Sequence, residues 1–138
     1  MKMLRYLLFL FLSSLATVQA EAKLVQASHL YMFGFSASFK DSVIYITDIQ
    51  DLQNVWIDRK TKHLYARDSY SLQLKEYFTE KLQEGDRVCM VFFAMSRSKA
   101  EQKYRKLKKK YTEKSKGYDV RELPSSEFSF QVIEASSE

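Results

Sequence analysis

The feature that most constrains the fold is an almost continuous apolar run at residues 87–95, which reads RVCMVFFAM. Its β-branched and aromatic residues favour a strand, and the run is short for a buried helix. A strand that is apolar on both sides is usually covered on both faces of its sheet. We therefore expect a central strand here, with Val88 to Phe93 as the least accessible segment of the chain.

A helical pattern precedes this run. Residues 68–85 place their apolar side chains on one helical face, at Tyr70, Leu74, Tyr77, Phe78 and Leu82. An acidic stripe lies beside that face, at Glu76, Glu80 and Glu84. We expect Asp68 or Ser69 to cap the start of this helix and Gly85 to end it.

A second, strongly basic helical pattern follows the run. Residues 97–116 contain ten Lys or Arg and two Glu. A capping box of Ser98 and Glu101 is expected to begin this helix, and Gly117 to end it. Its apolar side chains form one narrow stripe, at Ala100, Tyr104, Leu107 and Tyr111. Like charges four residues apart, such as Lys106 and Lys110, each cost about 0.2–0.5 kcal/mol.

Three interpretations of this basic surface are open. Solvent and salt could screen an ordinary exposed face, since exposed charges interact weakly. The acidic stripe of the first helix could neutralise it within the molecule. The third interpretation is a surface that binds an anionic partner. In that case the residues expected to contribute are Lys106, Lys109, Lys110, Lys99 and Arg105.

Alternation of apolar and polar residues predicts the remaining strands. Within residues 29–39, apolar and mostly aromatic side chains occupy every second position from Tyr31 to Phe39. VIYIT at 43–47 follows after a short polar break, which predicts a hairpin. Residues 118–123 and 128–132 alternate again on either side of a turn at Pro124. Residues 48–67 are expected to form an irregular excursion that lays Trp56 at the edge of the core, with a short helix or a second hairpin as alternatives.

The predicted fold class is therefore α/β of the α+β type, with the order β-β-α-β-α-β-β. Two helices with one apolar stripe each suit one face of a mostly antiparallel sheet, so we expect a two-layer sandwich.

The first twenty residues have the pattern of a signal peptide. Lys2 and Arg5 precede an apolar run, and Val18 and Ala20 are small residues at the two positions read by signal peptidase. The apolar run is shorter than the roughly 20 residues that span a bilayer. We expect cleavage after Ala20 and a single α/β domain at residues 21–138, exported to the periplasm or secreted, with no transmembrane segment in the mature chain.

The cysteine and histidine content and the absence of known catalytic motifs limit the chemistry that this chain can perform. The chain has one cysteine, Cys89, so an exported form has no disulfide framework and depends on its aromatic core. His29 and His63 lack metal-ligand spacing to a Cys, Asp or second His, so no metal or other cofactor is predicted. No glycine-rich phosphate loop and no G-x-S-x-G motif occur. These absences favour a binding module over an enzyme. The alternative is a small carboxylate-dependent hydrolase whose pocket combines Trp56, Asp58, Arg67 and His63.

Two stretches of the chain resemble a known group. They are SVIYITDIQDLQNVWIDRKTKHLYARDSYSLQLKEY, beginning at Ser42, and RVCMVFFAMSRSKAEQKYRKLKKKYTEKSKGYDVRELPSSEFSF, beginning at Arg87. They are similar to a family of small exported Bacteroidota proteins with a YITD…WID…LY.RD.YS.QL block and a VFF…KAE..Y.KLKKKY…YDV block. The resemblance implies a Gram-negative envelope or secreted location. It implies no activity and assigns no role to any residue.

The second half of the chain also resembles the SPOR domains, which are peptidoglycan-binding modules. The resemblance rests on VFFAMSRSKAEQKYRKLKKK, GYDVRE and FSFQV. The glutamine expected in the first strand of that family and its closing VGPF-like end are absent from this sequence.

Together these observations favour an exported binding or interaction module of the cell envelope. Its expected partner is an anionic envelope component or an anionic protein, contacted through the basic helix. Nucleic acid is not expected as the partner, because the aromatic residues of this helix fall on its apolar stripe rather than among the lysines. The sequence specifies neither the ligand nor the oligomeric state.

Overall fold

A long central strand organises the sheet. The computed structural model describes residues 23–114 and 117–135, so the predicted signal peptide lies outside the described residues. Strand β1 (Leu24–Ser38) pairs antiparallel with β2 (Val43–Thr47), β3 (Gln50–Asp58) and β4 (Arg87–Ala94), and β2 pairs in parallel with β5 (Asp119–Leu123). The predicted hairpin of the first two strands and the mostly antiparallel sheet are confirmed.

The two edges of β1 carry different partners. Phe35 pairs with both Ile46 of β2 and Met90 of β4, so β2 and β4 lie on opposite sides of β1. β3 continues along the same edge of β1 as β2, because Tyr31 pairs with both Asp51 and Ala94. Among the described residues β4 forms a ladder with β1 alone, so it is an edge strand.

The position of β4 corrects one expectation. We predicted a central strand with Val88 to Phe93 fully covered, but Val88 and Met90 are each 44% exposed. Val91 is buried on one face of β4, whereas Val88 and Met90 are exposed on the other face, near the start of the strand. An apolar run signals burial on both faces, and it does not reveal which edge of the strand stays unpaired.

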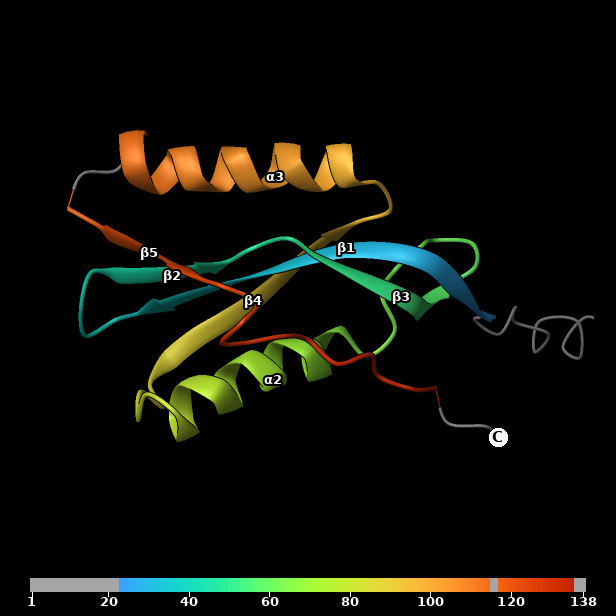
Figure 1. Cartoon of the computed structure of the whole chain (residues 1–138), viewed down its shortest axis with the longest axis horizontal. Coiled ribbons are helices and arrows are strands. Elements are labelled where there is room, and N and C mark those ends of the chain that lie inside the picture. Colours follow the sequence, from blue (N-terminus) through green and yellow to red (C-terminus); the bar gives the residue numbers. More distant parts are fainter. Residues whose placement is uncertain (1–22, 115–116, 136–138) are drawn as a thin grey trace, which may run out of the picture.

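The helices lie on opposite faces of the sheet (Figure 1). Helix α2 (Arg67–Glu80) packs below it, and helix α3 (Arg97–Lys109), extended by the π-helical turn η1 (Lys110–Lys114), packs above it. The α+β class is confirmed, as is the order in which the two helices alternate with strands. The expectation that both helices share one face is wrong, and the fold has three layers. Each helix has one apolar stripe, a property that fits either face of a sheet equally well.

Two hydrophobic cores correspond to these two faces. Under α2 the core contains Leu30, Met32, Tyr70, Leu74, Phe78 and Phe130. Under α3 it contains Phe33, Phe35, Ile44 and Ile46, with Tyr104, Leu107 and Tyr111 of the helix packed against them. Neighbouring residues of β1 therefore contribute side chains to different cores, because successive side chains of a strand point to opposite faces.

Residues 50–58 form strand β3 where we expected an irregular excursion. The alternation of buried and exposed residues in β3 shifts by one at Gln53-Asn54, where Asn54 has a φ of 57°, and β1 shifts at the paired position. A strand is recognised by alternation with a period of two, so a strand in which this alternation is interrupted is not predicted. After Asp58 the chain turns back along β3, and Ile57 forms an antiparallel bridge with Leu64. The alternative of a second hairpin is therefore confirmed in this short form, and the chain then leads into α2.

The C-terminal segment after Pro124 lies on the α2 face without forming a strand, although we predicted one at 128–132. Its backbone groups form hydrogen bonds with side chains, and they do not pair with a neighbouring strand. Gln50 accepts from the amide of Phe130 at 2.8 Å and donates to the carbonyl of Phe128 at 3.0 Å. The Tyr70 hydroxyl accepts from the amide of Ile133 at 2.9 Å.

Both helices begin at other residues than expected. Ser96 caps α3 by accepting from the amide of Lys99 at 3.3 Å, so the predicted capping box of Ser98 and Glu101 is wrong by two residues. Ala66 precedes α2 in a left-handed conformation, without a side-chain cap.

Candidate functional site

The apolar stripe of α3 fixes how the basic helix sits on the sheet. Tyr104 meets Phe33 edge-on at 5.4 Å between ring centres, and Tyr111 packs on Phe35 at 5.1 Å. Ala100 is fully buried at the start of the helix. The predicted stripe is therefore the contact surface, and the lysines around it point to the two flanks and the top of α3.

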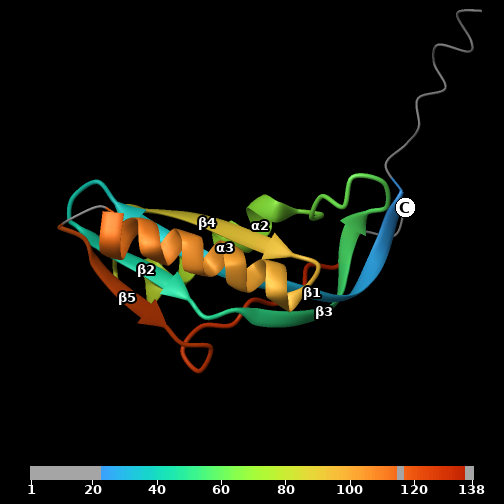
Figure 2. The ribbon, with the colours of Figure 1, turned by 90° about the horizontal axis from the view of Figure 1, so that it is seen from above.

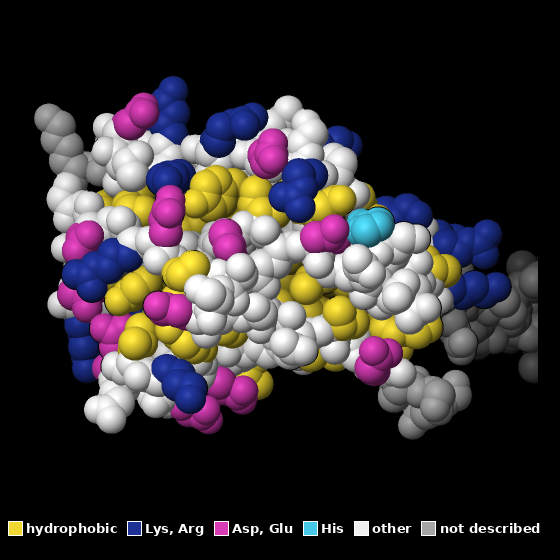
Figure 3. All heavy atoms as spheres, viewed as in Figure 1, with side chains coloured by type: hydrophobic (Ala, Val, Ile, Leu, Met, Phe, Trp, Pro, Cys, Tyr) yellow, Lys and Arg dark blue, Asp and Glu magenta, His cyan; other side chains and the backbone are white. Residues whose placement is uncertain are grey.

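The flank toward β5 is electrically balanced. Lys108 lies 2.7 Å from Glu122 of β5. The hydrogen bond to Lys108 lowers the pKa of Glu122, and the same bond raises the pKa of Lys108. Figure 3 shows acidic and basic side chains interspersed around the helix and sheet on the face of the molecule that it presents.

The flank toward β4 is different. It carries a hollow of about 520 Å³ between the helix and the edge strand, lined by Phe92, Lys103, Lys106, Leu107, Lys110 and Lys114. Figure 2 shows α3 from above, with β4 on one side and β2 and β5 on the other. Phe92, the only residue of β4 in this lining, places the hollow on the β4 side of the helix.

The lysines of the hollow form one stripe along the helix. At about 100° per residue, Lys103, Lys106 and Lys110 fall within an arc of about 60°, and Lys114, at the end of the π-helical turn η1, lines the same hollow. We call these four residues the lysine stripe. No carboxylate of the described residues, 23–114 and 117–135, forms an ion pair with any of the four. The stripe therefore contributes four positive charges to one side of the helix.

The contacts that these lysines do make leave their charge uncompensated. The Lys103 ammonium donates to the carbonyl oxygen of Phe93 at 2.8 Å and lies 5.8 Å from the centre of the Phe93 ring. The Lys110 ammonium lies 5.5 Å from the centre of the Tyr111 ring. A carbonyl or a ring face orients an ammonium group, but neither carries a full negative charge.

The five basic residues predicted from sequence divide between two places. Lys106 and Lys110 line the hollow. Lys99 falls on the same side of the helix by its spacing but outside that lining, and Arg105 and Lys109 fall outside the arc, on the exposed back. Lys109 lies 3.9 Å from Glu113, a long contact between exposed groups.

Sequence reasoning did not select Lys103, Lys114 or Phe92 for the site. The signal for the two lysines was present, because lysines recur at steps of three or four residues from Lys103 to Lys114. Phe92 carried no such signal, since its role depends on which strand lies beside α3.

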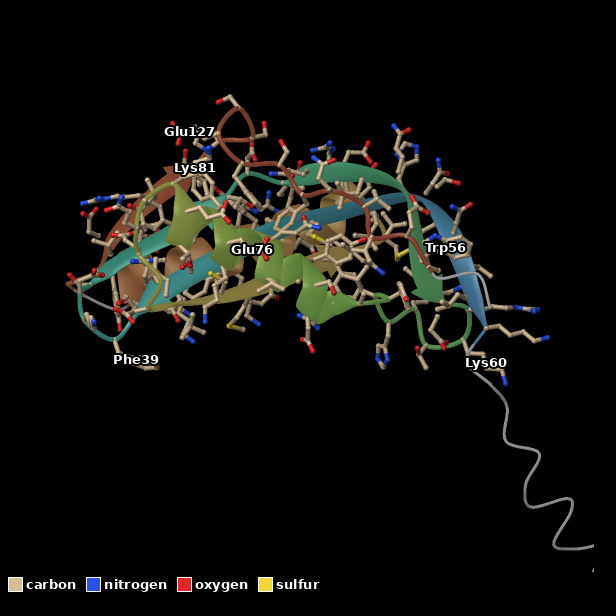
Figure 4. The ribbon with its side chains drawn as sticks, turned by 90° about the horizontal axis from the view of Figure 1, so that it is seen from below. Phe39, Trp56, Lys60, Glu76, Lys81 and Glu127 are labelled. Carbon is tan, nitrogen blue, oxygen red and sulfur yellow. The ribbon has the colours of Figure 1, made fainter. Side chains whose placement is uncertain are left out.

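The acidic stripe of α2 does not neutralise the basic helix. Figure 4 shows Glu76 on the face of the molecule that α2 covers, which is opposite to the face covered by α3. Glu84 lies 3.9 Å from Arg87, beneath the sheet. Because the two helices lie on opposite faces of the sheet, the acidic stripe of α2 is not the partner of the lysines on α3.

The alternative pocket is only partly brought together. Asp58 and His63 share a turn, in which the Asp58 carboxylate accepts from the amides of Lys60 and Thr61 at 2.9 and 2.8 Å. The amide of Thr61 is the largest cause that lowers the pKa of Asp58. This carboxylate thus serves the turn that it caps.

Trp56 and Arg67 have other partners. The indole nitrogen of Trp56 donates to Glu134 at 3.3 Å. Figure 4 shows Trp56 and Phe39 at opposite ends of the molecule. Arg67 donates to the carbonyl of Val91 at 2.6 Å and lies over the ring of Phe93, both in β4. No hydrogen bond or ion pair among the described residues joins Arg67 to Trp56, Asp58 or His63.

Other polar side chains show no metal-site geometry. The described ranges contain no group of three or more His, Cys, Asp or Glu residues placed to hold a metal ion. His29 lies 2.9 Å from Asp51 on neighbouring strands, and Asp48 accepts from the amide of Ser125. Asp48, Asp51 and Asp58 therefore have separate structural partners.

Comparison with known proteins gives no match: no family model matches the chain, nor does any curated protein or solved structure. Neither α2 nor α3 has the length and apolar character of a membrane-spanning helix, and this finding covers the described residues only.

Proposed function

We propose that this protein is an exported binding module of the cell envelope and that α3 holds an anionic envelope component on the flank that faces β4. The proposal rests on a difference in charge compensation between the two flanks of α3. Lys108 is paired with Glu122, whereas the lysine stripe has no acidic partner in the described part of the chain.

The stripe costs stability in the absence of a partner. Lys106 and Lys110, and Lys110 and Lys114, are like charges four residues apart, and each such pair is unfavourable by about 0.2–0.5 kcal/mol. An anion in the hollow would relieve this repulsion and would gain attraction from several ammonium groups at once. A surface screened only by solvent has no physical reason to gather its unpaired lysines over a hollow.

Nucleic acid is not the proposed partner. Non-specific binding of single strands combines a basic groove with aromatic rings on which bases stack. Tyr104 and Tyr111 pack against Phe33 and Phe35 and offer no such surface. A phosphate-bearing or carboxylate-bearing molecule of the envelope fits the lysines without requiring stacking.

The test uses two matched double variants and a defined probe. Lys106→Gln with Lys110→Gln removes two charges from the hollow, and Arg105→Gln with Lys109→Gln removes two charges from the exposed back of the same helix. Binding of tripolyphosphate is measured by calorimetry at low and high salt. We expect the first variant to bind at least about tenfold more weakly at low salt, with a smaller difference at high salt, since salt screens exposed charges.

Thermal unfolding provides the control for folding. Both variants should melt at or above the temperature of the unmodified protein, because neither removes buried apolar area and the first relieves like-charge repulsion. Equal weakening by the two variants would show general attraction to a basic helix and would contradict a site in the hollow. Unchanged binding in both would leave α3 as a solvated face.

The export part of the proposal has its own test. The mature protein isolated from cells should begin at Glu21, because Val18 and Ala20 match the signal peptidase pattern. Mass spectrometry of the cell-derived protein measures this directly. A folded protein that retains residues 1–20 would contradict export by this route.

A further inference from the structure

The floor of the hollow is apolar, although its rim is charged. Phe92 of β4 and Leu107 of α3 line it, and both side chains are only half-buried. A site for a small inorganic anion would instead present polar groups or backbone amides at its base. An apolar floor with a basic rim suits a molecule that has an apolar part and an anionic part.

Further apolar side chains of the edge strand stand beside the hollow, outside its lining. Val88 and Met90 pair with Ala37 and Phe35 of β1, whose side chains belong to the core under α3. Val88 and Met90 therefore project on the α3 side, where each is 44% exposed. With Phe92 they form an apolar strip along β4, which we call the β4 strip.

We propose that the hollow binds an anionic amphiphile, a molecule with an acyl chain and a phosphate or carboxylate headgroup. The chain lies over Phe92, Leu107 and the β4 strip, and the headgroup contacts the lysine stripe. This inference rests on the proposed function, because it names the ligand class for the same lysines.

The dimensions of the site suit such a ligand. The volume of about 520 Å³ lies within the range of about 300–1,000 Å³ that is usual for small-molecule sites. The lysine stripe spans Lys103 to Lys114, about 16 Å along a helix that rises about 1.5 Å per residue. A headgroup at any point of the rim therefore lies close to at least two of the four lysines, which recur at every turn.

Two other ligand classes fit less well. An added β-strand would require free backbone groups along β4, but the carbonyl oxygens of Val91 and Phe93 already accept from Arg67 and Lys103. A neutral glycan would require hydrogen-bonding side chains on the floor, where Phe92 and Leu107 offer only carbon. The charge complementarity of the rim and the apolar character of the floor together select the amphiphile.

The principal experiment varies chain length at a constant headgroup. Butyl, octyl and dodecyl phosphate are titrated into the unmodified protein by calorimetry, each below its critical micelle concentration, with inorganic phosphate as the chain-free reference. Each methylene that is buried should raise affinity about fourfold. We expect affinity to rise steeply from butyl to octyl phosphate. Dodecanoate tests whether a carboxylate headgroup replaces the phosphate.

Variants separate the two halves of the ligand. Lys106→Gln with Lys110→Gln should weaken octyl phosphate binding at least about tenfold, and Arg105→Gln with Lys109→Gln should leave it within about twofold. Met90→Gln, at an exposed position, should flatten the dependence on chain length without changing the affinity for tripolyphosphate. Leu107→Asn should act in the same direction, and the chain-length series on the unmodified protein does not depend on whether that variant folds.

The outcomes distinguish this inference from the proposed function. Tripolyphosphate binding that depends on the lysine stripe, together with no effect of chain length, would retain the anion site and overturn the amphiphile. Equal affinity for dodecyl phosphate and neutral dodecyl maltoside would overturn the role of the headgroup. Chain-length dependence that is lost in Met90→Gln and headgroup dependence that is lost in the lysine variant would together support it.

Discussion

The ammonium group of Lys108 lies 2.7 Å from the carboxylate of Glu122, and this pair joins α3 to β5 across the top of the sheet. It compensates one positive charge of the basic helix on the flank that faces β5. The lysine stripe lies on the opposite flank and lines the hollow beside β4.

The first prediction concerns the titration of this pair. In Lys108→Gln, the pKa of Glu122 should rise toward the ordinary glutamate value, because the hydrogen bond that lowers it is lost. Carboxyl-detected NMR titration measures the change, with Lys109→Gln as a control that leaves Glu122 in place. An unchanged pKa of Glu122 in Lys108→Gln would show that the pair does not persist in solution.

The same pair sets a direction for stability against pH. Because the pKa of Glu122 is lowered on folding, its contribution is present above the ordinary glutamate pKa and is lost as the pH falls through the lowered pKa. The contribution of Lys108, whose pKa is raised, is lost as the pH rises through that raised pKa. Both groups are substantially exposed, so the total should stay below about 1 kcal/mol.

The second prediction concerns Gly34 at the centre of β1. A Cβ atom added there would lie 2.6 Å from a methyl carbon of Leu74 and 3.2 Å from the ring of Phe130. Gly34→Ala should therefore lower the free energy of unfolding by about 1–3 kcal/mol, the usual cost of overpacking. Urea denaturation measures it.

Gly85→Ala is the matched control, because its added Cβ would meet only Thr79, at an ordinary contact distance of 3.6 Å. We expect a change within about 1 kcal/mol, since the glycine adopts no left-handed backbone. Equal losses from the two variants would show that the Leu74 contact does not set the cost.

The third prediction concerns Arg87, a buried cation at the start of β4. Arg87 is 2% exposed, and its Nε donates to the Ser36 hydroxyl at 2.9 Å. Its guanidinium lies over the rings of Tyr45 and Phe78, at 4.8 and 5.3 Å from their centres. This side chain joins β1, β2, β4 and α2 in one cluster.

Replacement of Arg87 by Met should lower the free energy of unfolding by at least about 2 kcal/mol, because hydrogen bonds from charged donors contribute about 1.5–3 kcal/mol each. Arg121→Met is the control, since Arg121 pairs with Asp119 on the surface. A loss below about 1 kcal/mol for Arg87→Met would show that apolar packing alone suffices at this position. Chemical denaturation of both variants makes the comparison.

The fourth prediction concerns Cys89, whose side chain is half-buried under the sheet. Burial raises the pKa of its thiol, so little of the reactive thiolate forms at neutral pH. A disulfide reagent should modify Cys89 slowly in the native protein and rapidly after unfolding. A Cys89→Ser background with Ser126→Cys, an exposed position, gives the rate for an unprotected thiol. Equal native rates would contradict the burial of Cys89.

The strand and helix segments with an unbroken period were predictable. The face of α2 that carries Tyr70, Leu74 and Phe78 is buried, as its spacing indicated. The hairpin of β1 and β2 and the apolar stripe of α3 were also predicted correctly. Where the period breaks, as at Asn54 of β3, or where side chains replace a ladder, as Gln50 does for Phe130, local pattern gave the wrong structure.

The candidate site divides in the same way. The sequence by itself determined that α3 is basic and that Tyr104 and Leu107 bind it to the core, because helical spacing is a local property of consecutive residues. Only the tertiary structure decided that α2 lies on the other face, that Glu122 neutralises one flank, and that β4 is an edge strand with exposed Val88 and Met90. Those relations depend on the order of strands in the sheet, and strand order is set by pairing between segments distant in the chain, which no local pattern records.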